Sequence, residues 1–493
     1  MRVLQVCAEI FPLLKTGGLA DVAGALPSAL RAQGADVRVL LPGFAPILAA
    51  LEDVIEIARL QPPAALAGVQ SRLLRGHLPA CKAEAYVIDA PHYYLRGGEN
   101  GGGPYADAND QPYADNAQRF ALLGWVGAEL AQGLDPSWQP QVVHAHDWHA
   151  ALAPAYVHAA AEAGKPVKSG TVFTVHNLAY QGLFDASQFS GLGLPAHFFN
   201  MHGVEFHGQL NFMKAGLHYA DHITTVSPRY AREIQSPEQG CGLDGVLRER
   251  AHVLSGVLNG VDDTVWNPAT DTLLAANYQP ERLAGKARCK RAVQEELGLE
   301  ANAKTALFCV VSRLTEQKGL HLLLQALPAL LEHEAQGAQL AVLGSGDATL
   351  EAAFAAAATA RPGALALRIG YDEALAHRLI AGSDIILVPS RFEPCGLTQL
   401  YGLKYGTLPL VRRVGGLADS VRDTRLETLD SDATGFVFDD FSSAGLLAAA
   451  QRALALYRRP AEWKRVQQRA MRQTFDWQAA ASHYMELYRS LAR

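Results

Sequence analysis

A lysine beside two glycines is the first feature of the chain that could bind an anion. Lys15 lies just before Gly17 and Gly18, and apolar residues at helical spacing begin at Leu19. Glycine lets backbone N–H groups approach an anion closely, and a helix N-terminus favours negative charge. The loop therefore predicts a phosphate or carboxylate site, with a tight turn beside a solvated lysine as the alternative. Its glycines match neither the dinucleotide-binding nor the P-loop pattern.

A histidine-rich segment follows a strand-like run that begins at Val142. Residues 144–149 read His-Ala-His-Asp-Trp-His, and ligands of open α/β sheets bind beyond the carboxyl ends of strands. Three interpretations stay open: a metal site on His144, His146 and His149, a set of buried hydrogen-bonding residues, or polar recognition of a sugar. Because neighbouring strand residues point to opposite faces, only part of the segment can converge on one point.

A further histidine, His176, ends the next strand-like run, Thr171–His176. Its imidazole could hydrogen-bond a hydroxyl of a ligand. It could equally be a core histidine whose hydrogen bonds are satisfied within the protein. Taken alone, the residue favours neither interpretation.

Two cations flank a loop in the second half of the chain, where a strand-like run ends and a helix-like run begins. Arg313 follows the run Ala306–Val311, and Lys318 precedes the run Leu320–Leu331. A guanidinium grips phosphate through two parallel hydrogen bonds, and a lysine adds a compact positive charge. The spacing predicts a phosphate site, with a solvated pair of charges as the alternative.

A carboxylate on a proline-flanked loop follows another strand-like run of the second half. Glu393 stands between this run and residues 396–398, Gly-Leu-Thr, which open a helix. The carboxylate can accept hydrogen bonds from sugar hydroxyls, and the amides of residues 396–398 can meet a diphosphate. A helix cap is the alternative for Glu393. Tyr371, which precedes another helix-like run, is a candidate to stack on a nucleobase.

Strands and helices alternate along the chain, which predicts parallel sheets covered by helices on both faces. The segment Asn259–Asp263 is dense in turn-forming residues and marks the expected junction between two domains. The expected strands are Val3–Ala8, Val37–Leu41, Ala85–Asp89, Val142–His144, Thr171–His176 and His222–Val226 before the junction, and Ala306–Val311, Gln339–Leu343, Ala366–Ile369, Asp384–Val388 and Leu408–Val411 after it. The expected helices include Asn116–Gln132, His149–Ala163, Leu320–Leu331, Ala374–Ala381 and Gly396–Lys404.

The final segment, Trp477–Leu491, is expected to form an amphipathic helix. Its apolar face carries Trp477, Ala481, Tyr484, Tyr488 and Leu491. Two positions stay open for this helix. It could finish the second domain, or it could cross back to the first.

Composition limits the class of protein. The 493 residues exceed one ordinary core, and 49% hydrophobic with 19% charged residues is the balance of a globular protein. A net charge of −6 argues against nucleic acid, whose binding needs a basic face. No apolar stretch reaches the length of a membrane span, and the N-terminus lacks a signal-peptide pattern. The six cysteines form no CxxC pair, so we expect a reducing, cytoplasmic compartment and no structural zinc.

Taken in order, these motifs resemble those of the bacterial glycogen synthases, the family that includes the plant starch synthases. The matching segments are Lys15–Val22, His146–His149, His176–Asn177, Asn259–Asp262, Ser312–Gly319 and Glu393–Gly402. The match runs from residue 1 to about 490, and its ordered motifs across both halves make it specific.

The resemblance implies the GT-B fold, an α/β class in which two Rossmann-like, doubly wound domains face each other across a cleft. It implies an N-terminal acceptor and catalytic domain over residues 1–260 and a nucleotide-sugar-binding domain over residues 261–472. It also implies a C-terminal helix over residues 473–493 that packs back on the N-terminal domain.

The activity implied by the resemblance is that of a glycosyltransferase in glycogen biosynthesis. Glucose would pass from ADP-glucose to the non-reducing 4-OH end of an α-1,4-glucan, with retention of configuration. No cofactor and no metal are expected. The expected partners are ADP-glucose and a glycogen or maltooligosaccharide acceptor, without nucleic acid or membrane, and a homo-oligomer is left open.

The resemblance also assigns roles to individual residues. The catalytic residues would be His176, Asp147, Arg313, Lys318, Glu393 and Asp21. The donor would be bound by Lys15, Gly17, Gly18, Asn259, Arg313, Lys318, Tyr371, Cys395, Gly396, Leu397 and Thr398. The acceptor and the transferred sugar would be bound by Tyr105, Trp148, His149, Asn177 and Glu393. Many retaining enzymes of this fold carry a second carboxylate where this chain has Tyr401, which favours a front-face reaction over a paired-carboxylate mechanism.

Three rival functions remain. A transferase of the same fold could use a UDP- or GDP-sugar and a different acceptor, which competition among nucleotide sugars would reveal. A glucan-binding protein without activity would be expected to lack a charged motif residue, and none is missing. A metal-dependent hydrolase built on His144, His146 and His149 would be inhibited by chelators.

Overall fold

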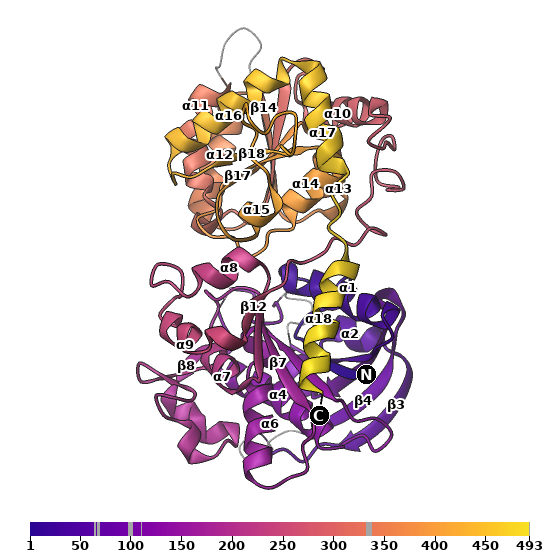
Figure 1. The fold of residues 1–493 in the computed structure, drawn as a ribbon, viewed down its shortest axis with the longest axis vertical. Helices are drawn as coiled ribbons and strands as arrows, with labels where there is room; N and C mark the ends of the chain where they lie inside the picture. Colours follow the sequence, from indigo (N-terminus) through magenta and orange to yellow (C-terminus); the bar gives the residue numbers. More distant parts are fainter. Residues whose placement is uncertain (64–65, 67–69, 97–101, 110, 332–337, 493) are drawn as a thin grey trace. The chain divides into compact units, whose positions relative to one another are not determined.

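The computed structural model (Figure 1) describes residues 1–63, 66, 70–96, 102–109, 111–331 and 338–492. The chain divides into two compact units. The first unit is made of Met1–Gly260 with Trp477–Arg493, and the second of Val261–Asp476. Each unit is built on a mainly parallel sheet and has its own large hydrophobic core.

The main sheet of the first unit has the strand order β12-β11-β7-β6-β1-β2-β5-β4-β3, and neighbours run parallel from β12 to β5. Its strands are β1 (Arg2–Val6), β2 (Asp36–Pro42), β3 (Glu52–Arg59), β4 (Arg72–Leu78), β5 (Ala83–Asp89), β6 (Val142–His146), β7 (Gly170–Val175), β11 (His222–Thr225) and β12 (Leu254–Gly256). A smaller antiparallel sheet is formed by β8 (Leu183–Asp185), β10 (Gln209–Asn211) and β9 (Glu205–Phe206).

One edge of the main sheet departs from the expected parallel arrangement. Strand β4 pairs antiparallel with both β5 and β3, and the apolar pattern misses β3 and β4. Parallel neighbours need a long crossover, whereas only a short turn at Pro79–Lys82 joins β4 to β5. Strand β3 is exposed along most of its length and so lacks the apolar run of a buried strand. The prediction of an all-parallel sheet is therefore wrong at this edge.

Helices connect the strands of the first unit. They are α1 (Gly18–Ala32), α2 (Ala45–Ala49), α3 (Pro91–Tyr94), α4 (Asn116–Ala131), α5 (Asp147–Ala150), α6 (Leu152–Glu162), α7 (Phe212–Tyr219), α8 (Pro228–Glu233), α9 (Asp244–Glu249) and α18 (Trp477–Leu491), with 3₁₀ turns at Pro79–Cys81, Ala186–Leu192, Ala196–Phe198 and Ala251–Val253. The expected helix Asn116–Gln132 is confirmed as α4. The expected helix His149–Ala163 is divided at Ala151 into α5 and α6.

The C-terminal helix α18 belongs to the first unit. Its residues Trp477, Tyr484 and Tyr488 are buried in a cluster with apolar residues of α1. Gln33, just beyond α1, donates a hydrogen bond to the carbonyl of Gln478 at 2.9 Å. The helix therefore crosses back to the first unit, and the interpretation in which it finishes the second is wrong.

The sheet of the second unit is parallel throughout, with the order β15-β14-β13-β16-β17-β18. Its strands are β13 (Ala306–Val311), β14 (Ala338–Gly344), β15 (Leu365–Ile369), β16 (Ile385–Val388), β17 (Leu408–Arg412) and β18 (Phe436–Phe438). Its helices are α10 (Ala284–Leu297), α11 (Leu320–Leu331), α12 (Ala348–Ala360), α13 (Glu373–Gly382), α14 (Thr398–Tyr405), α15 (Gly415–Ser420), α16 (Ser443–Tyr457) and α17 (Pro460–Met471), with a 3₁₀ turn at Glu316–Lys318. The strands and helices predicted here are confirmed, whereas β18 was not predicted.

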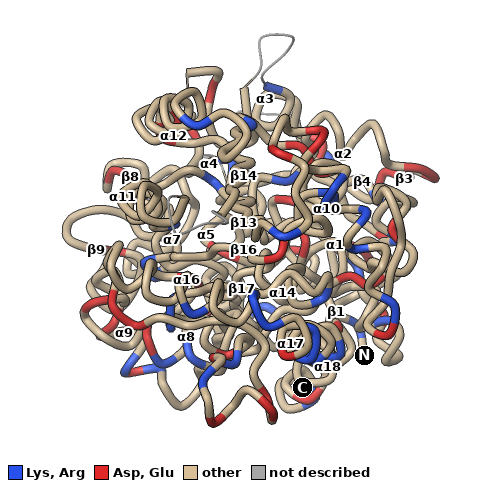
Figure 2. The backbone as a smooth tube through the Cα atoms, turned by 90° about the horizontal axis from the view of Figure 1, so that it is seen from above, with Lys and Arg blue, Asp and Glu red and all other residues tan. Residues whose placement is uncertain are grey.

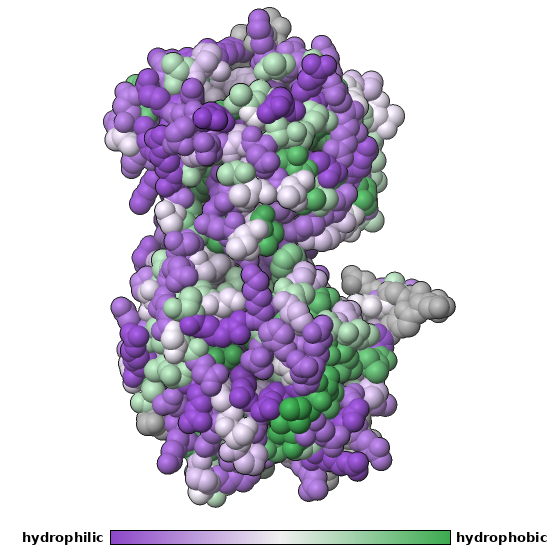
Figure 3. Space-filling view, turned by 90° about the vertical axis from the view of Figure 1, so that its right-hand side faces the viewer, coloured by the Kyte–Doolittle hydropathy of each residue, from purple (hydrophilic) through white to green (hydrophobic). Residues whose placement is uncertain are grey.

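The surface mixes charges of both signs and carries a hydrophobic area. Lys and Arg are interspersed with Asp and Glu along the helices and loops (Figure 2), in keeping with the small net charge. Figure 3 faces the side on which β3 lies in Figure 1 and shows hydrophobic side chains gathered on the first unit. Val54 and Ile55 of β3 are half-exposed. Within the described ranges, no helix is both long and apolar enough to span a membrane.

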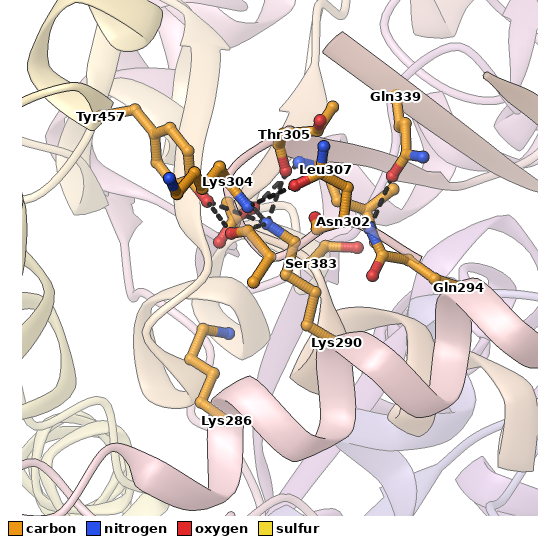
Figure 4. Close-up of polar contacts among 12 residues, drawn as sticks. Lys286, Lys290, Gln294, Asn302, Lys304, Thr305, Leu307, Gln339, Ser383 and Tyr457 are labelled. Atoms are coloured by element: carbon orange, nitrogen blue, oxygen red, sulfur yellow. Dashed lines mark hydrogen bonds and ion pairs between the residues drawn. The ribbon is translucent and has the colours of Figure 1, made fainter. Parts of the chain in front are cut away.

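Two lysines of α10 are buried at the amino-terminal ends of the second sheet's strands (Figure 4). Lys290 Nζ lies 2.7 Å from Asp384 Oδ2 and donates to the Thr305 carbonyl at 2.6 Å. Lys286 Nζ donates to the Thr407 hydroxyl at 2.7 Å, and burial lowers the pKa of Lys286 to about 8. These contacts fix α10 against the residues that precede β13, β16 and β17.

Replacing Lys290 with methionine should destabilise the second unit, because the Asp384 carboxylate would stay buried without its cation. Removing one partner of a buried ion pair costs about 3–5 kcal/mol. Chemical denaturation followed by circular dichroism measures the free energy of unfolding. The control is Arg291→Met on the same helix, whose exposed pair with Glu295 should contribute less than about 1 kcal/mol. Equal effects of the two substitutions would contradict a structural role for the buried pair.

Candidate active site

The loop after β1 is ordered by a buried carboxylate that the sequence motifs did not single out. Glu9 accepts hydrogen bonds from the Thr16 backbone N–H at 2.6 Å and from the Thr16 hydroxyl at 2.5 Å. The Tyr105 hydroxyl donates to the same carboxylate at 2.5 Å. Glu9, which is 2% exposed, therefore joins the glycine loop to Tyr105, a predicted sugar-binding residue.

Lys15 forms an ion pair with Asp21, with 3.0 Å between Nζ and Oδ1. Asp21 lies in the first turn of α1, where the helix dipole favours a carboxylate. Gly17 is the N-cap of α1, and a Cβ at this position would meet no atom of the described chain within 4 Å. Packing within the unit thus does not require glycine there, and the space beside the helix N-terminus is open.

Trp148 and His149 follow β6, and their rings gather with that of Tyr105. Tyr105 and His149 stack with ring centroids 4.4 Å apart, and Trp148 lies against His149 at 4.1 Å. Burial lowers the pKa of His149 to about 3, so its imidazole is neutral. Burial and the charge of Glu9 hold the pKa of Tyr105 well above its usual value. The structure thus brings together three of the predicted sugar-binding residues in an uncharged aromatic cluster.

Asp147 follows β6 in a left-handed backbone conformation, with a φ of 55°. Its Oδ1 accepts hydrogen bonds from the backbone N–H groups of His176 at 2.8 Å and Asn177 at 3.4 Å. Burial raises the pKa of Asp147 to about 7, which the two N–H groups oppose and the charge of Glu9 assists. This carboxyl group therefore titrates near neutral pH at the carboxyl ends of β6 and β7.

The histidines of the segment 144–149 point to different partners. His144 contacts the Tyr488 hydroxyl at 2.6 Å, and His146 contacts His176 at 3.0 Å, while His149 joins the aromatic cluster. In the part of the chain that the structure describes, no group of three or more His, Cys, Asp or Glu side chains could hold a metal ion. His144 and His146 are thus buried hydrogen-bonding residues beneath the predicted sugar-binding residues.

In the second unit, Lys318 and Glu393 form an ion pair beyond the carboxyl ends of two neighbouring strands. Lys318 Nζ lies 2.6 Å from Glu393 Oε2, and the Ser390 hydroxyl donates to the same oxygen at 2.8 Å. Lys318 ends the 3₁₀ turn after β13, and Glu393 follows β16, which pairs with β13. The Glu393 carboxylate is buried and the lysine is partly exposed. The structure thus joins two residues that the sequence placed on separate loops.

Two glycines let the loops around this pair approach each other closely. A Cβ on Gly319, next to Lys318, would lie 2.0 Å from the carbonyl oxygen of Pro389. A Cβ on Gly415, at the start of α15, would lie 1.9 Å from the carbonyl oxygen of Glu393. Both glycines also have a positive φ, of 70° and 41°. No side chain fits at either place, so these glycines set the spacing of the loops that hold the ion pair.

Other predicted donor-binding residues lie beyond the same edge of the second sheet. Arg313 follows β13, and Cys395 is buried in the loop after β16. Gly396 has a φ of 72°, and Leu397 is the N-cap residue of α14, which begins at Thr398. The backbone amides of this loop therefore lie at a helix N-terminus.

Two further predicted residues differ in their surroundings. Tyr371, after β15, is 70% exposed, and its hydroxyl donates a hydrogen bond to Glu373. Asn259 is buried at the end of the first unit.

Tyr401 is a core residue, because its ring stacks on Trp266 with centroids 3.8 Å apart and an interplanar angle of 6°.

Sequence reasoning assigned no role to Glu9 and Ser390, which organise the predicted site residues of the first unit and of the second unit, respectively. Each lies a few residues beyond a strand, and that position was their one sequence signal. Their partners are distant in sequence: Tyr105 for Glu9 and, through the shared carboxylate, Lys318 for Ser390. Such contacts between distant residues become visible only in the folded structure.

Replacing Asp147 with asparagine should stabilise the protein increasingly as pH rises from about 4 to about 7. A carboxyl group whose pKa is raised on folding binds its proton more tightly in the folded state, so ionisation opposes folding. Asparagine tolerates the left-handed backbone and does not ionise. The gain should level off above about pH 7 at no more than roughly 4 kcal/mol, as measured by chemical denaturation across pH.

The matched control is Asp53→Asn on β3, where φ is 53° and the side chain is exposed to solvent. Its effect on the free energy of unfolding should stay small and change little with pH. A pH-independent effect of Asp147→Asn would contradict the raised pKa of Asp147.

Two family models match the chain. The starch synthase catalytic domain matches residues 2–249, and the model of glycosyl transferases group 1 matches residues 295–469. The chain is 65% identical over 493 residues to the glycogen synthase of Leptothrix cholodnii, with both chains covered completely. It is 59% identical over 495 residues to the glycogen synthase of Variovorax paradoxus, covering 99% of this chain and 98% of that one.

Solved structures match the same fold. The catalytic domain of starch synthase IV from Arabidopsis thaliana, bound to ADP and acarbose, matches with a TM-score of 0.87 and 30% identity, over 100% of this chain and 99% of that one. Sucrose-phosphate synthase from Thermosynechococcus elongatus matches with a TM-score of 0.58 and 17% identity, over 99% and 98% of the two chains. The chain has two Rossmann-like units, and its C-terminal helix returns to the first. Together with these full-length matches, this architecture shows that the chain belongs to the glycogen synthase family of GT-B glycosyltransferases.

Proposed function

We propose that this enzyme transfers glucose from ADP-glucose to the non-reducing 4-OH end of an α-1,4-glucan, with retention of configuration and without a metal ion. The observation that carries the proposal is the ion pair between Lys318 and Glu393. It sets a cation suited to a leaving diphosphate beside a carboxylate suited to sugar hydroxyls. The names of the full-length relatives support the same reaction.

The second unit binds the donor. Arg313, Lys318 and the amides of residues 396–398 hold the diphosphate, on which negative charge builds as the glycosidic bond breaks. Cations and N–H dipoles that are already oriented toward this charge lower the barrier. Tyr371, with its exposed ring, stacks on the adenine. The ADP in the related starch synthase IV structure supports this nucleotide.

Glu393 binds hydroxyl groups of the transferred glucose. Its carboxylate is already held by Lys318 and by the Ser390 hydroxyl, so little reorganisation is needed when a sugar arrives. Lys318 thus has two tasks, since it orients Glu393 and faces the leaving phosphate.

The first unit supplies the acceptor and sugar contacts. Tyr105, Trp148 and His149 offer aromatic faces to a glucan, and the neutral His176 meets a hydroxyl of the transferred glucose. Asp147 lies next to His176 and carries a negative charge above about pH 7. The Lys15–Asp21 pair orders the glycine loop, and the open space at Gly17 supports an anionic ligand there.

The reaction proceeds on the front face through an oxocarbenium-like state. Tyr401 stands where a second carboxylate would be needed for a paired-carboxylate mechanism, and its ring is stacked on Trp266 in the core. A phenol in that position offers neither the charge nor the access of a nucleophile. The departing diphosphate itself is then the base nearest to the incoming hydroxyl.

We place the reaction in the bacterial cytoplasm. All six cysteines lie in described segments and none is bonded to another, as expected in a reducing compartment. The two relatives compared above are bacterial proteins.

Release of nucleoside diphosphate from ADP-glucose and from UDP-glucose, each with and without glycogen and in the presence of EDTA, tests the proposal. We expect glycogen-dependent release from ADP-glucose that persists in EDTA. Release from UDP-glucose alone would overturn the donor while keeping the fold and the acceptor. Loss of activity in EDTA would overturn metal independence, and glycogen-independent release would overturn the acceptor.

A further inference from the structure

His176 makes a hydrogen bond through one ring nitrogen only. Its Nε2 lies 3.0 Å from His146 Nδ1. Its Nδ1 has no hydrogen-bond partner among the residues that the structure describes, and this atom is not sealed from solvent. His176 is 9% exposed, so its second nitrogen remains available to a ligand.

His146 uses both of its ring nitrogens. Nδ1 faces His176, and Nε2 lies 3.1 Å from Gln5 Oε1. Gln5 and His146 have no exposed surface. Gln5 lies on β1, next to β6, which carries His146. A continuous chain of hydrogen bonds therefore runs from the centre of the sheet to its carboxyl end.

Both imidazoles in this chain are neutral. Burial lowers the pKa of His176 to about 3 and holds the pKa of His146 well below its usual value. A neutral imidazole carries one proton, and its hydrogen bonds decide which nitrogen holds it. The tautomer of each ring, and not its charge, is thus the variable that the surroundings can set.

The direction of the chain follows from Gln5. The Gln5 amide is oriented with its oxygen toward His146 Nε2. A carbonyl oxygen only accepts hydrogen bonds, so in this orientation His146 carries its proton on Nε2. His146 Nδ1 then has a lone pair and must accept. His176 must therefore donate from Nε2, which leaves its Nδ1 as an acceptor.

We propose that Gln5 and His146 are positioning residues that hold His176 in the tautomer whose Nδ1 accepts a hydrogen bond, so that His176 selects a sugar hydroxyl that can donate. The inference rests on the proposed function, in which the ligand of His176 is the transferred glucose. Neither Gln5 nor His146 contacts the sugar, and both act through His176. We call this chain of hydrogen bonds the tautomer relay. No proton is transferred along it, since it only fixes where each proton resides.

A neighbouring histidine offers a matched control. His144 Nδ1 contacts the Tyr488 hydroxyl and its Nε2 contacts the Thr174 hydroxyl, both at 2.6 Å. Its ring lies 4.1 Å from that of His146, but the two share no hydrogen bond. Thr174→Val should therefore change the environment of His144 and leave the proton of His176 on Nε2.

Nitrogen-15 NMR of the full-length enzyme, labelled at histidine, tests the relay without any substrate. Protonated and unprotonated ring nitrogens have well-separated shifts, and the spectra of His146→Asn and His176→Asn assign the two rings. We expect the wild type to show His146 protonated on Nε2 and His176 protonated on Nε2. A proton on His176 Nδ1 would overturn the proposal, and the wild-type spectrum alone decides this point.

Gln5→Met removes the carbonyl that fixes the direction of the relay. His146 should then move its proton to Nδ1 and donate to His176, which would become protonated on Nδ1. Gln5→Leu also lacks an accepting oxygen and should give the same pattern as Gln5→Met. An unchanged tautomer of His176 in Gln5→Met would overturn the role of Gln5.

ADP-glucose analogues in which one ring hydroxyl at a time is replaced by fluorine test the sugar contact, since fluorine cannot donate. At one ring position, the wild type and Thr174→Val should prefer hydroxyl over fluorine in kcat/KM by about tenfold or more. Gln5→Met should lose this preference at that position and keep its responses at the others. The NMR spectra could be as expected while the wild type prefers hydroxyl over fluorine at no ring position. That result would overturn the sugar contact of His176 and leave the tautomer relay supported.

Discussion

Burying polar and charged side chains beyond the ends of parallel strands is costly unless they find partners, and both units of this protein are shaped by that constraint. In the second unit the constraint is met by the pair of Lys318 and Glu393. A buried carboxylate without a cation would cost several kcal/mol. The loops after β13 and β16 are therefore drawn together, and glycines at 319 and 415 make that approach sterically feasible. Arg313 and residues 395–397, which are proposed to bind the donor, lie on the same two loops.

The first unit meets the same constraint with neutral groups. Four buried histidines there have lowered pKa values, and Asp147 has a raised one. Each of these shifts favours the uncharged form of the buried group, which then depends on hydrogen bonds to its neighbours. Helix α18 supplies one of them through Tyr488, so the end of the chain helps to satisfy the polar centre of a unit built from its beginning.

The contrast between the two units matches the division of roles proposed above. A diphosphate leaving group needs cations and N–H dipoles, and these lie in the second unit at Arg313, Lys318 and the start of α14. A glucan needs aromatic faces and neutral hydrogen-bonding groups, and these lie in the first unit. The relay from Gln5 to His176 extends this logic, because the tautomer of a neutral histidine decides whether a given ring nitrogen accepts a hydrogen bond from a hydroxyl or donates one to it.

Much of the fold could be predicted because most strands are buried on both faces and read as continuous apolar runs. Strand β13 and helix α11 have the bounds that were expected. Strand β3 could not be found in the same way, because an exposed edge strand has no apolar run. Among candidate site residues, Lys318 and Glu393 were recognisable from their loops. Glu9 was not, since its role depends on Tyr105, a partner far away in sequence.

The most direct measurement of the central interaction is the affinity for ADP, by isothermal titration calorimetry, of the wild type, Lys318→Met and Glu393→Gln. If Lys318 is the cation of the diphosphate site, Lys318→Met should weaken binding by roughly tenfold or more. Glu393→Gln should bind ADP at least as tightly as the wild type, since it removes a competing carboxylate from the lysine. Arg291→Met, on the surface of the same unit, should bind like the wild type. Wild-type affinity in Lys318→Met would contradict the assignment of this ion pair to the donor site.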